Sequence, residues 1–205
     1  MIKQLLIMGI GIFFILMLLI YFGQRYLIYL PSKASPSRRI DAAQDMEIVA
    51  LKTEDGLQLL SWYKPAAKGM PTMLYLHGNA GHIGYRMPLV RRFLDQGIGV
   101  FLLEYRGYGG NEGKPSEAGL YQDGQAAVTF LQTHGVALSQ LVLYGESLGT
   151  GVATKLAASY QVCGIILQTP YTSLAALARY HYPWIVIKPW DRFDSLGRMT
   201  AINAP

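Results

Sequence analysis

The pentapeptide at positions 145–149, Gly-Glu-Ser-Leu-Gly, constrains the fold of this chain more than any other feature. An apolar run at 141–144 precedes it, and a small-residue stretch of helical character at 150–158 follows it. A strand that reverses sharply into a helix strains the residue at the turn, and the flanking glycines leave room for that backbone. The turn holds the Ser147 hydroxyl at a helix N-terminus, where developing negative charge is favoured. This setting predicts a nucleophilic serine, whereas the bare pattern also occurs by chance.

Expected strands and helices alternate along the rest of the chain. Strands at 47–52 and 57–63 flank a Glu-Asp-Gly turn and predict an antiparallel hairpin. Helical periodicity is expected over 82–96 and 116–133. Further short apolar strands are expected at 72–76, 100–103, 141–144 and 164–167. This alternation predicts a parallel sheet with helices on both faces, and an active site at the carboxyl ends of its strands.

The N-terminus contains an apolar run at 5–22, with no charged residue between Lys3 and Arg25. Eighteen helical residues span ~27 Å, about the hydrocarbon thickness of a bilayer. A cleaved signal peptide is the alternative, but the run exceeds the usual ~7–15 apolar residues and no Ala-x-Ala-like site follows closely. We therefore expect a retained single-pass anchor at residues 1–30, in contact with the lipid bilayer through residues 5–22. A Pro/Ser-rich linker at 31–45, irregular at least over 31–37, and a body at 46–205 would follow.

The charge of the chain is concentrated near that anchor. Five of the 18 basic residues and none of the 13 acidic residues lie in residues 1–40, so the remainder carries 13 of each. This distribution gives no indication of nucleic-acid binding. Four of the five basic residues follow the apolar run, which places the body in the cytoplasm by the positive-inside rule. A single cysteine, Cys163, excludes an intramolecular disulfide.

A second candidate site element is the glycine-rich turn at 77–81, His-Gly-Asn-Ala-Gly, which follows an expected strand. Such a turn presents backbone N–H groups that can hold an oxyanion, together with the N–H of the residue after a nucleophile. Asn79 and Leu148 are the candidates for the oxyanion hole through their main-chain N–H groups. A plain glycine turn is the alternative. His77 lies at the strand end and is expected to support the loop rather than act as a base.

Three motifs, at 77–81, 104–109 and 144–151, resemble those of serine hydrolases of the α/β-hydrolase superfamily, in the subgroup with one N-terminal membrane anchor. A segment at 191–196 looks like the one that precedes the seventh strand in that subgroup. The resemblance runs from about residue 25 to the last residue. It implies a mostly parallel α/β-hydrolase-type sheet flanked by helices.

The resemblance also implies roles for single residues. Ser147 would be the nucleophile, Asn79 and Leu148 would form the oxyanion hole, and the loop at 106–109 would shape the pocket rim. Glu104 stands where the family usually has aspartate, which we expect to be a tolerated packing change. The implied substrate is a small molecule with an ester, thioester or amide bond, acyl or peptide-like in character.

The order of the later residues departs from the family pattern. The triad of this fold runs serine, acid, histidine along the chain. After Ser147 the chain contains one histidine, His181, followed by the acids Asp191 and Asp194, which is the reverse order. The resemblance therefore predicts a partial domain, truncated before the catalytic Asp and His, with an exposed strand edge at 165–167. A substitute base at His181 is the disfavoured alternative, since its aromatic surroundings are more typical of a cap.

Other interpretations remain open from the sequence. The chain is either such a hydrolase, or a non-enzymatic membrane-tethered remnant or interaction module, or one part of a domain completed by a second chain. The aromatic residues between 171 and 193 predict an apolar cap for acyl or aromatic esters, or ordinary core packing. Four scattered histidines and one cysteine fit no metal-ligand spacing, so neither a metal nor a cofactor is expected.

Overall fold

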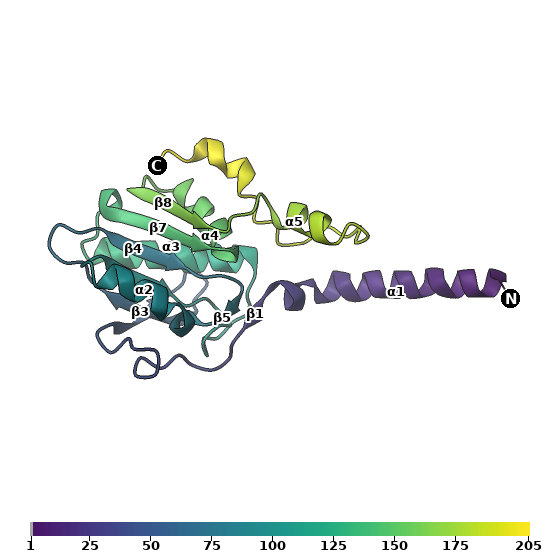
Figure 1. Ribbon diagram of the computed structural model, residues 1–205, viewed down its shortest axis with the longest axis horizontal. Coiled ribbons are helices and arrows are strands. Elements are labelled where there is room, and N and C mark those ends of the chain that lie inside the picture. Colours follow the sequence, from purple (N-terminus) through teal and green to yellow (C-terminus); the bar gives the residue numbers. More distant parts are fainter. Residues whose placement is uncertain (1) are drawn as a thin grey trace.

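A computed structural model describes residues 2–205, and its body is built around one six-stranded sheet (Figure 1). The strand order is β2-β3-β6-β4-β7-β8. The pairs β6·β4, β4·β7 and β7·β8 are parallel, and β2·β3 and β3·β6 are antiparallel, so the predicted hairpin and mostly parallel sheet are confirmed. The strands are β2 Glu47–Lys52, β3 Gln58–Lys64, β4 Thr72–Leu76, β6 Gly99–Leu103, β7 Leu141–Glu146 and β8 Gly164–Gln168.

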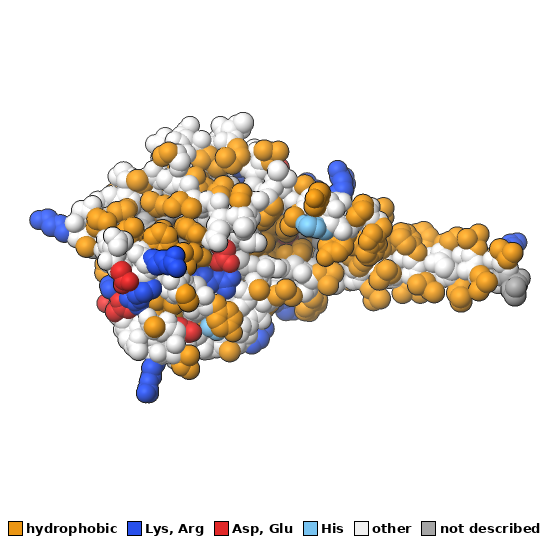
Figure 2. All heavy atoms as spheres, viewed as in Figure 1, with side chains coloured by type: hydrophobic (Ala, Val, Ile, Leu, Met, Phe, Trp, Pro, Cys, Tyr) orange, Lys and Arg blue, Asp and Glu red, His pale blue; other side chains and the backbone are white. Residues whose placement is uncertain are grey.

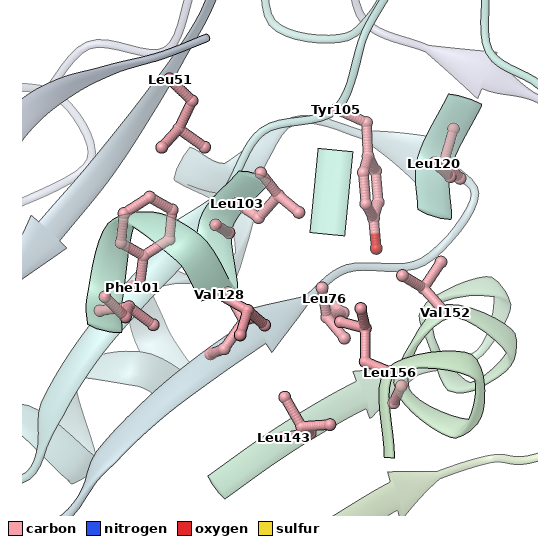
Figure 3. Close-up of a cluster of buried hydrophobic side chains, with 14 of the residues drawn as sticks. Leu51, Leu76, Phe101, Leu103, Tyr105, Leu120, Val128, Leu143, Val152 and Leu156 are labelled. Atoms are coloured by element: carbon pink, nitrogen blue, oxygen red, sulfur yellow. The ribbon is translucent and has the colours of Figure 1, made fainter. Parts of the chain in front are cut away.

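Helices cover both faces of this sheet. α2 (Met87–Leu94) packs on one face, while α3 (Glu117–Thr133) and α4 (Leu148–Ala157) pack on the other. Every residue of the central strands β4 and β6 is buried, as continuous apolar strands between two helical layers require. Figure 3 shows the larger core, in which side chains of these strands and of β7 meet those of α3 and α4.

The helix expected over 82–96 is divided into two parts. A 3₁₀ turn at Ile83–Arg86 precedes α2. Pro88 lies in the first turn of α2 and has no N–H to donate to the carbonyl four residues earlier, so the α-helix begins there and not before. The next helix starts where expected, because the Ser116 hydroxyl accepts a hydrogen bond from the Gly119 N–H, 3.1 Å away, and caps α3.

The N-terminal helix α1 (Ile2–Ile28) extends away from the body (Figure 1). It has 27 residues and a mean hydropathy of 2.9 over its best 18-residue window, which is enough by length and composition to cross a membrane. Met17 and Gln24 are its buried residues, and the remaining side chains along the apolar run are almost all exposed.

The linker was expected to be irregular from Pro31, but Pro31 belongs to a short strand. β1 (Leu30–Pro31) pairs in parallel with β5 (Ala80–Gly81), so the chain leaving α1 is hydrogen-bonded to the glycine-rich turn. The exposed edge expected at β8 is partly covered, because the Ile165 N–H donates to the Pro205 carbonyl over 2.9 Å. Beyond β8 the chain forms α5 (Leu174–His181) and a 3₁₀ turn at Leu196–Ala201.

Candidate active site

Ser147 occupies the sharp turn between β7 and α4 that the sequence predicts. Its φ of 48° and ψ of −113° lie in a region that L residues rarely adopt, so the backbone is strained at this residue. A Cβ added at Gly145 would lie 2.7 Å from the Gly149 carbonyl oxygen. One added at Gly149 would lie 2.6 Å from the carbonyl carbon of Leu76, at the end of β4. Only glycines allow α4 to start this close to the sheet.

The glycine-rich turn is held from several sides. The Asn79 side-chain amide donates to the Ile28 carbonyl over 3.0 Å. The Asn79 carbonyl accepts hydrogen bonds from the Leu30 N–H and the Tyr108 hydroxyl, each 2.9 Å away. Within residues 2–205, the backbone N–H groups of Asn79 and Leu148 donate to no carbonyl of a turn, loop or helix cap. These two donors are therefore available to a ligand.

His77 and Glu104 form a fully buried pair beneath this turn. The imidazole Nε2 lies 3.1 Å from Glu104 Oε1, and Nδ1 lies 2.7 Å from the Gly78 carbonyl oxygen. Glu104 Oε2 accepts a hydrogen bond from the Ile83 N–H at 3.0 Å. The position of His77 agrees with the expected supporting role. Glu104 is more than a packing change, because its carboxylate connects the glycine-rich turn to the 3₁₀ turn at Ile83–Arg86.

Arg86 and Glu146 form a second link, which sequence reasoning missed. Arg86 Nε lies 3.0 Å from Glu146 Oε2, and Nη2 lies 3.1 Å from Oε1, so the pair is bidentate. The same guanidinium donates to the Ala80 carbonyl over 2.9 Å. The Tyr75 hydroxyl also donates to Glu146, at 2.9 Å. Arg86 thus ties the turn that holds Asn79 to the residue next to Ser147, across 60 residues of sequence.

Two opposing influences act on the pKa of Glu146. Burial raises it, but the hydrogen bonds and charge of Arg86, with the Tyr75 hydroxyl, outweigh burial and leave the pKa below its usual value. A carboxylate with a lowered pKa in the folded state stabilises the fold above its unfolded-state pKa. It loses that contribution as the pH falls through the folded-state pKa.

We therefore expect Glu146→Gln to be less stable than wild type at neutral pH, with a difference that shrinks as the pH falls below about 4.5. Glutamine keeps the size of the side chain but removes the charge that pairs with Arg86. Urea unfolding of the full-length protein in detergent, followed across this pH range, measures the difference. Glu54→Gln, at an exposed position, is the matched control. A pH-independent difference for Glu146→Gln would contradict the ionised pair.

The predicted site residues meet at one cavity of about 620 Å³. Ser147, Leu148 and Asn79 lie on its wall, and His181 lines it as well. The rest of the lining is mostly apolar and comes from three segments, represented by Ile20 and Leu27 of α1, Leu174 and Leu177 of α5, and Trp184 and Ile187 of the following loop. Within residues 2–205, no cluster of three or more metal-ligating side chains is present.

Two expectations about the surroundings of the cavity need correction. The loop at 106–109 does not line the cavity; Tyr108 is buried behind the glycine-rich turn, where its hydroxyl holds the Asn79 carbonyl. The six aromatic residues of the segment 171–193 were expected to form either an apolar cap or part of the core, and the structure divides them between the two. Phe193 is buried and Tyr171 packs against the core, whereas the others are exposed: Tyr180, Tyr182, Trp184 and Trp190.

Comparisons with known proteins agree with the α/β-hydrolase fold. A family model described as serine aminopeptidase, S33, matches residues 68–193, which is more than half of the chain. An uncharacterised protein of Mycobacterium tuberculosis is 38% identical over 194 residues, which cover 91% of this chain and 68% of that protein. An uncharacterised membrane protein of Saccharomyces cerevisiae is 35% identical, over 80% of this chain and 61% of its own length.

Among solved structures, an α/β-hydrolase from Vibrio vulnificus is similar in fold. Its TM-score is 0.65 at 23% identity, and the match covers 79% of this chain and 61% of the Vibrio chain. The chain thus spans about two thirds of the length of its mycobacterial relative, and less of the yeast relative and of the Vibrio structure.

Proposed function

The chain belongs to the α/β-hydrolase family whose model is described as serine aminopeptidase, S33, and on that basis we propose that it is a membrane-anchored serine hydrolase. Ser147 is the nucleophile, and the substrate is an ester, thioester or amide with an apolar acyl group. One observation supports this most strongly. The strained Ser147 faces the same mostly apolar cavity as Asn79 and Leu148, whose N–H groups are available.

The proposed reaction proceeds by acyl transfer. The Ser147 oxygen attacks the carbonyl carbon, and negative charge develops on the carbonyl oxygen. The N–H groups of Asn79 and Leu148 stabilise that charge, aided by the N-terminus of α4. The alcohol, thiol or amine then leaves with a proton, and water releases the acyl group from Ser147 as a carboxylic acid. Removing one such oxyanion donor costs about 10²–10³ in turnover in a characterised serine hydrolase.

A general base has to accept the Ser147 proton. In this superfamily the acid and the histidine follow the nucleophile in that order, after strands beyond the six of the described sheet. We propose that the whole protein supplies both from those strands, because this chain spans about two thirds of the length of its mycobacterial relative. His181 lines the cavity and is the alternative base within the described chain.

The membrane anchor is the second part of the proposal. α1 would cross the bilayer through residues 5–22 and leave the body in the cytoplasm. Its length and hydropathy support a spanning helix, as does the basic stretch that follows it. The name of the yeast relative describes that relative as a membrane protein.

A fluorophosphonate probe tests the nucleophile, because it reacts with serines that are activated by their surroundings. In membranes containing the full-length protein, wild type is expected to be labelled and Ser147→Ala to lose all labelling. Ser159→Ala, at an exposed position after α4, is the matched control and should label as wild type does. We expect His181→Ala to remain labelled, and loss of labelling in that variant would identify His181 as the base. Folded wild type without labelling would contradict the proposed enzyme and favour a non-enzymatic module.

A further inference from the structure

Large apolar side chains gather on one exposed surface between α5 and Asp191. Tyr180 and Val186 are 82% and 76% exposed. Figure 2 shows hydrophobic side chains continuing from α1 onto this part of the body. Exposed apolar surface of this extent marks a site of interaction with another molecule or with a membrane. We call this surface the aromatic cap, and its members are Leu177, Tyr180, Tyr182, Trp184, Val186 and Trp190.

The aromatic cap is attached to α1 around the end of the apolar run. The Trp190 backbone N–H donates to Gln24 Oε1 over 2.6 Å, and the Trp190 ring centroid lies 5.1 Å from that of Tyr21. Next to it, Arg25 forms an ion pair of 2.9 Å with the buried Asp191. These contacts place the cap at the depth at which a spanning α1 would leave the hydrocarbon. Figure 1 shows the loop after α5 lying near α1 and pointing in the same direction.

The composition of the aromatic cap matches the interfacial layer of a bilayer. Tryptophan and tyrosine favour that layer, because each has an apolar ring and a polar group that stays in contact with water. Residues 171–190 contain Arg179 and Lys188, both exposed, and no aspartate or glutamate. Cations beside aromatic rings suit a surface of anionic lipid headgroups, which attract basic side chains near the membrane.

From these observations we propose that the aromatic cap is a second membrane-contacting surface, which lies in the interfacial layer beside α1. This inference rests on the proposed anchoring by α1. It has a consequence for the substrate, which rests in addition on the proposed chemistry of Ser147. Both α1 and the cap form walls of the cavity, so the cavity borders the surface that we propose to face lipid. An acyl chain would enter it from the leaflet, and the substrate class is a membrane-resident acyl lipid or lipid-modified molecule.

Tryptophan fluorescence tests the membrane contact without any need for activity. The chain has three tryptophans: Trp62 is buried in β3, and Trp184 and Trp190 belong to the cap. The full-length protein would be reconstituted into phosphatidylcholine and phosphatidylglycerol vesicles whose acyl chains carry bromine, a short-range quencher. Wild type is expected to lose the part of its emission that comes from the cap. The variant Trp184→Phe/Trp190→Phe, altered only at exposed rings, reports the tryptophans outside the cap, such as the buried Trp62, and should show no quenching.

The outcomes of this experiment test the cap contact and the anchor separately. Quenching of wild type but not of the double variant supports the membrane-contacting cap. Protein that floats with the vesicles but shows no quenching overturns it. Protein that does not float with the vesicles overturns the anchor and the cap contact together. Fluorophosphonate labelling of Ser147 is measured separately, so failure of the proposed chemistry remains distinguishable from all three.

Discussion

Replacing Gly149 by alanine is expected to lower the free energy of unfolding by more than about 3 kcal/mol, above the usual cost of overpacking. The added methyl group would lie 2.6 Å from the Leu76 carbonyl carbon and closer still to its oxygen. Leu76 ends the central strand β4, which is paired on both sides with β6 and β7. The strand cannot move away without losing that pairing, so α4 and Ser147 would have to shift.

Thermal unfolding of the full-length protein in detergent, followed by circular dichroism, measures this effect. Gly164→Ala is the matched control, because a methyl group there would lie 3.6 Å from the Pro205 carbonyl oxygen, an ordinary contact. Its stability should change by no more than about 0.5 kcal/mol. Fluorophosphonate labelling should also be lost in Gly149→Ala, since Ser147 and Leu148 are displaced together. An unchanged melting temperature would show that α4 does not approach β4 this closely.

Replacing Asp123 by alanine is expected to destabilise the fold by about 3 kcal/mol, the lower end of the cost of breaking a buried ion pair. The Asp123 side chain is fully buried and accepts hydrogen bonds from the Arg106 backbone N–H at 3.0 Å and from Nε at 2.8 Å. Its removal would leave two donors without an acceptor inside the protein. Asp55 lies 2.6 Å from Nη1 and retains part of the charge compensation, so the upper end of the range is not expected.

Asp55→Ala is the matched control, because it removes the other partner of the same guanidinium. The Asp55 side chain is 37% exposed, so water can replace many of the contacts that its carboxylate makes with Arg106. Its removal should therefore cost no more than about 1 kcal/mol. Urea unfolding of both variants in detergent, at neutral pH, compares the two. Equal losses of stability in the two variants would contradict the view that burial determines how much each carboxylate contributes through Arg106.

Asp123 also affects the candidate site through the loop that Arg106 begins. Two residues later, the Tyr108 hydroxyl holds the Asn79 carbonyl. A displaced Arg106 would loosen this support, so Asp123→Ala should label more slowly than wild type with fluorophosphonate even where it remains folded. Asp55→Ala should keep the rate of wild type.

The turn at Ser147 could be predicted because its causes are local. The glycine spacing, the apolar strand before it and the small-residue helix after it all lie within 18 residues, 141–158. The mostly parallel sheet follows in the same way from the alternation of strands and helices. The sequence also contained a signal for the division of the helix after residue 82, namely Pro88. An analysis of helical periodicity alone does not detect it.

The support of the site could not be predicted, since its contacts join residues far apart in sequence. Arg86 and Glu146 are separated by 60 residues, and Arg25 and Asp191 by 166. A charged residue in a sequence has many candidate partners, and only packing of the backbone selects one. The expected position of the loop at 106–109 was wrong for the same reason, because the burial of Tyr108 depends on the strands around it.

By itself, the sequence determined the α/β architecture, the strained serine turn and the presence of an apolar N-terminal helix long enough to cross a membrane. Each depends on periodicity or on steric limits that act within a few residues. Only the tertiary structure decided that α1, α5 and the loop after α5 enclose one cavity with Ser147. It also decided that the aromatic residues of 171–193 divide between core and surface. Burial depends on how the helices and strands pack together. Aromatic side chains of the same segment therefore end up buried or exposed only once the chain has folded.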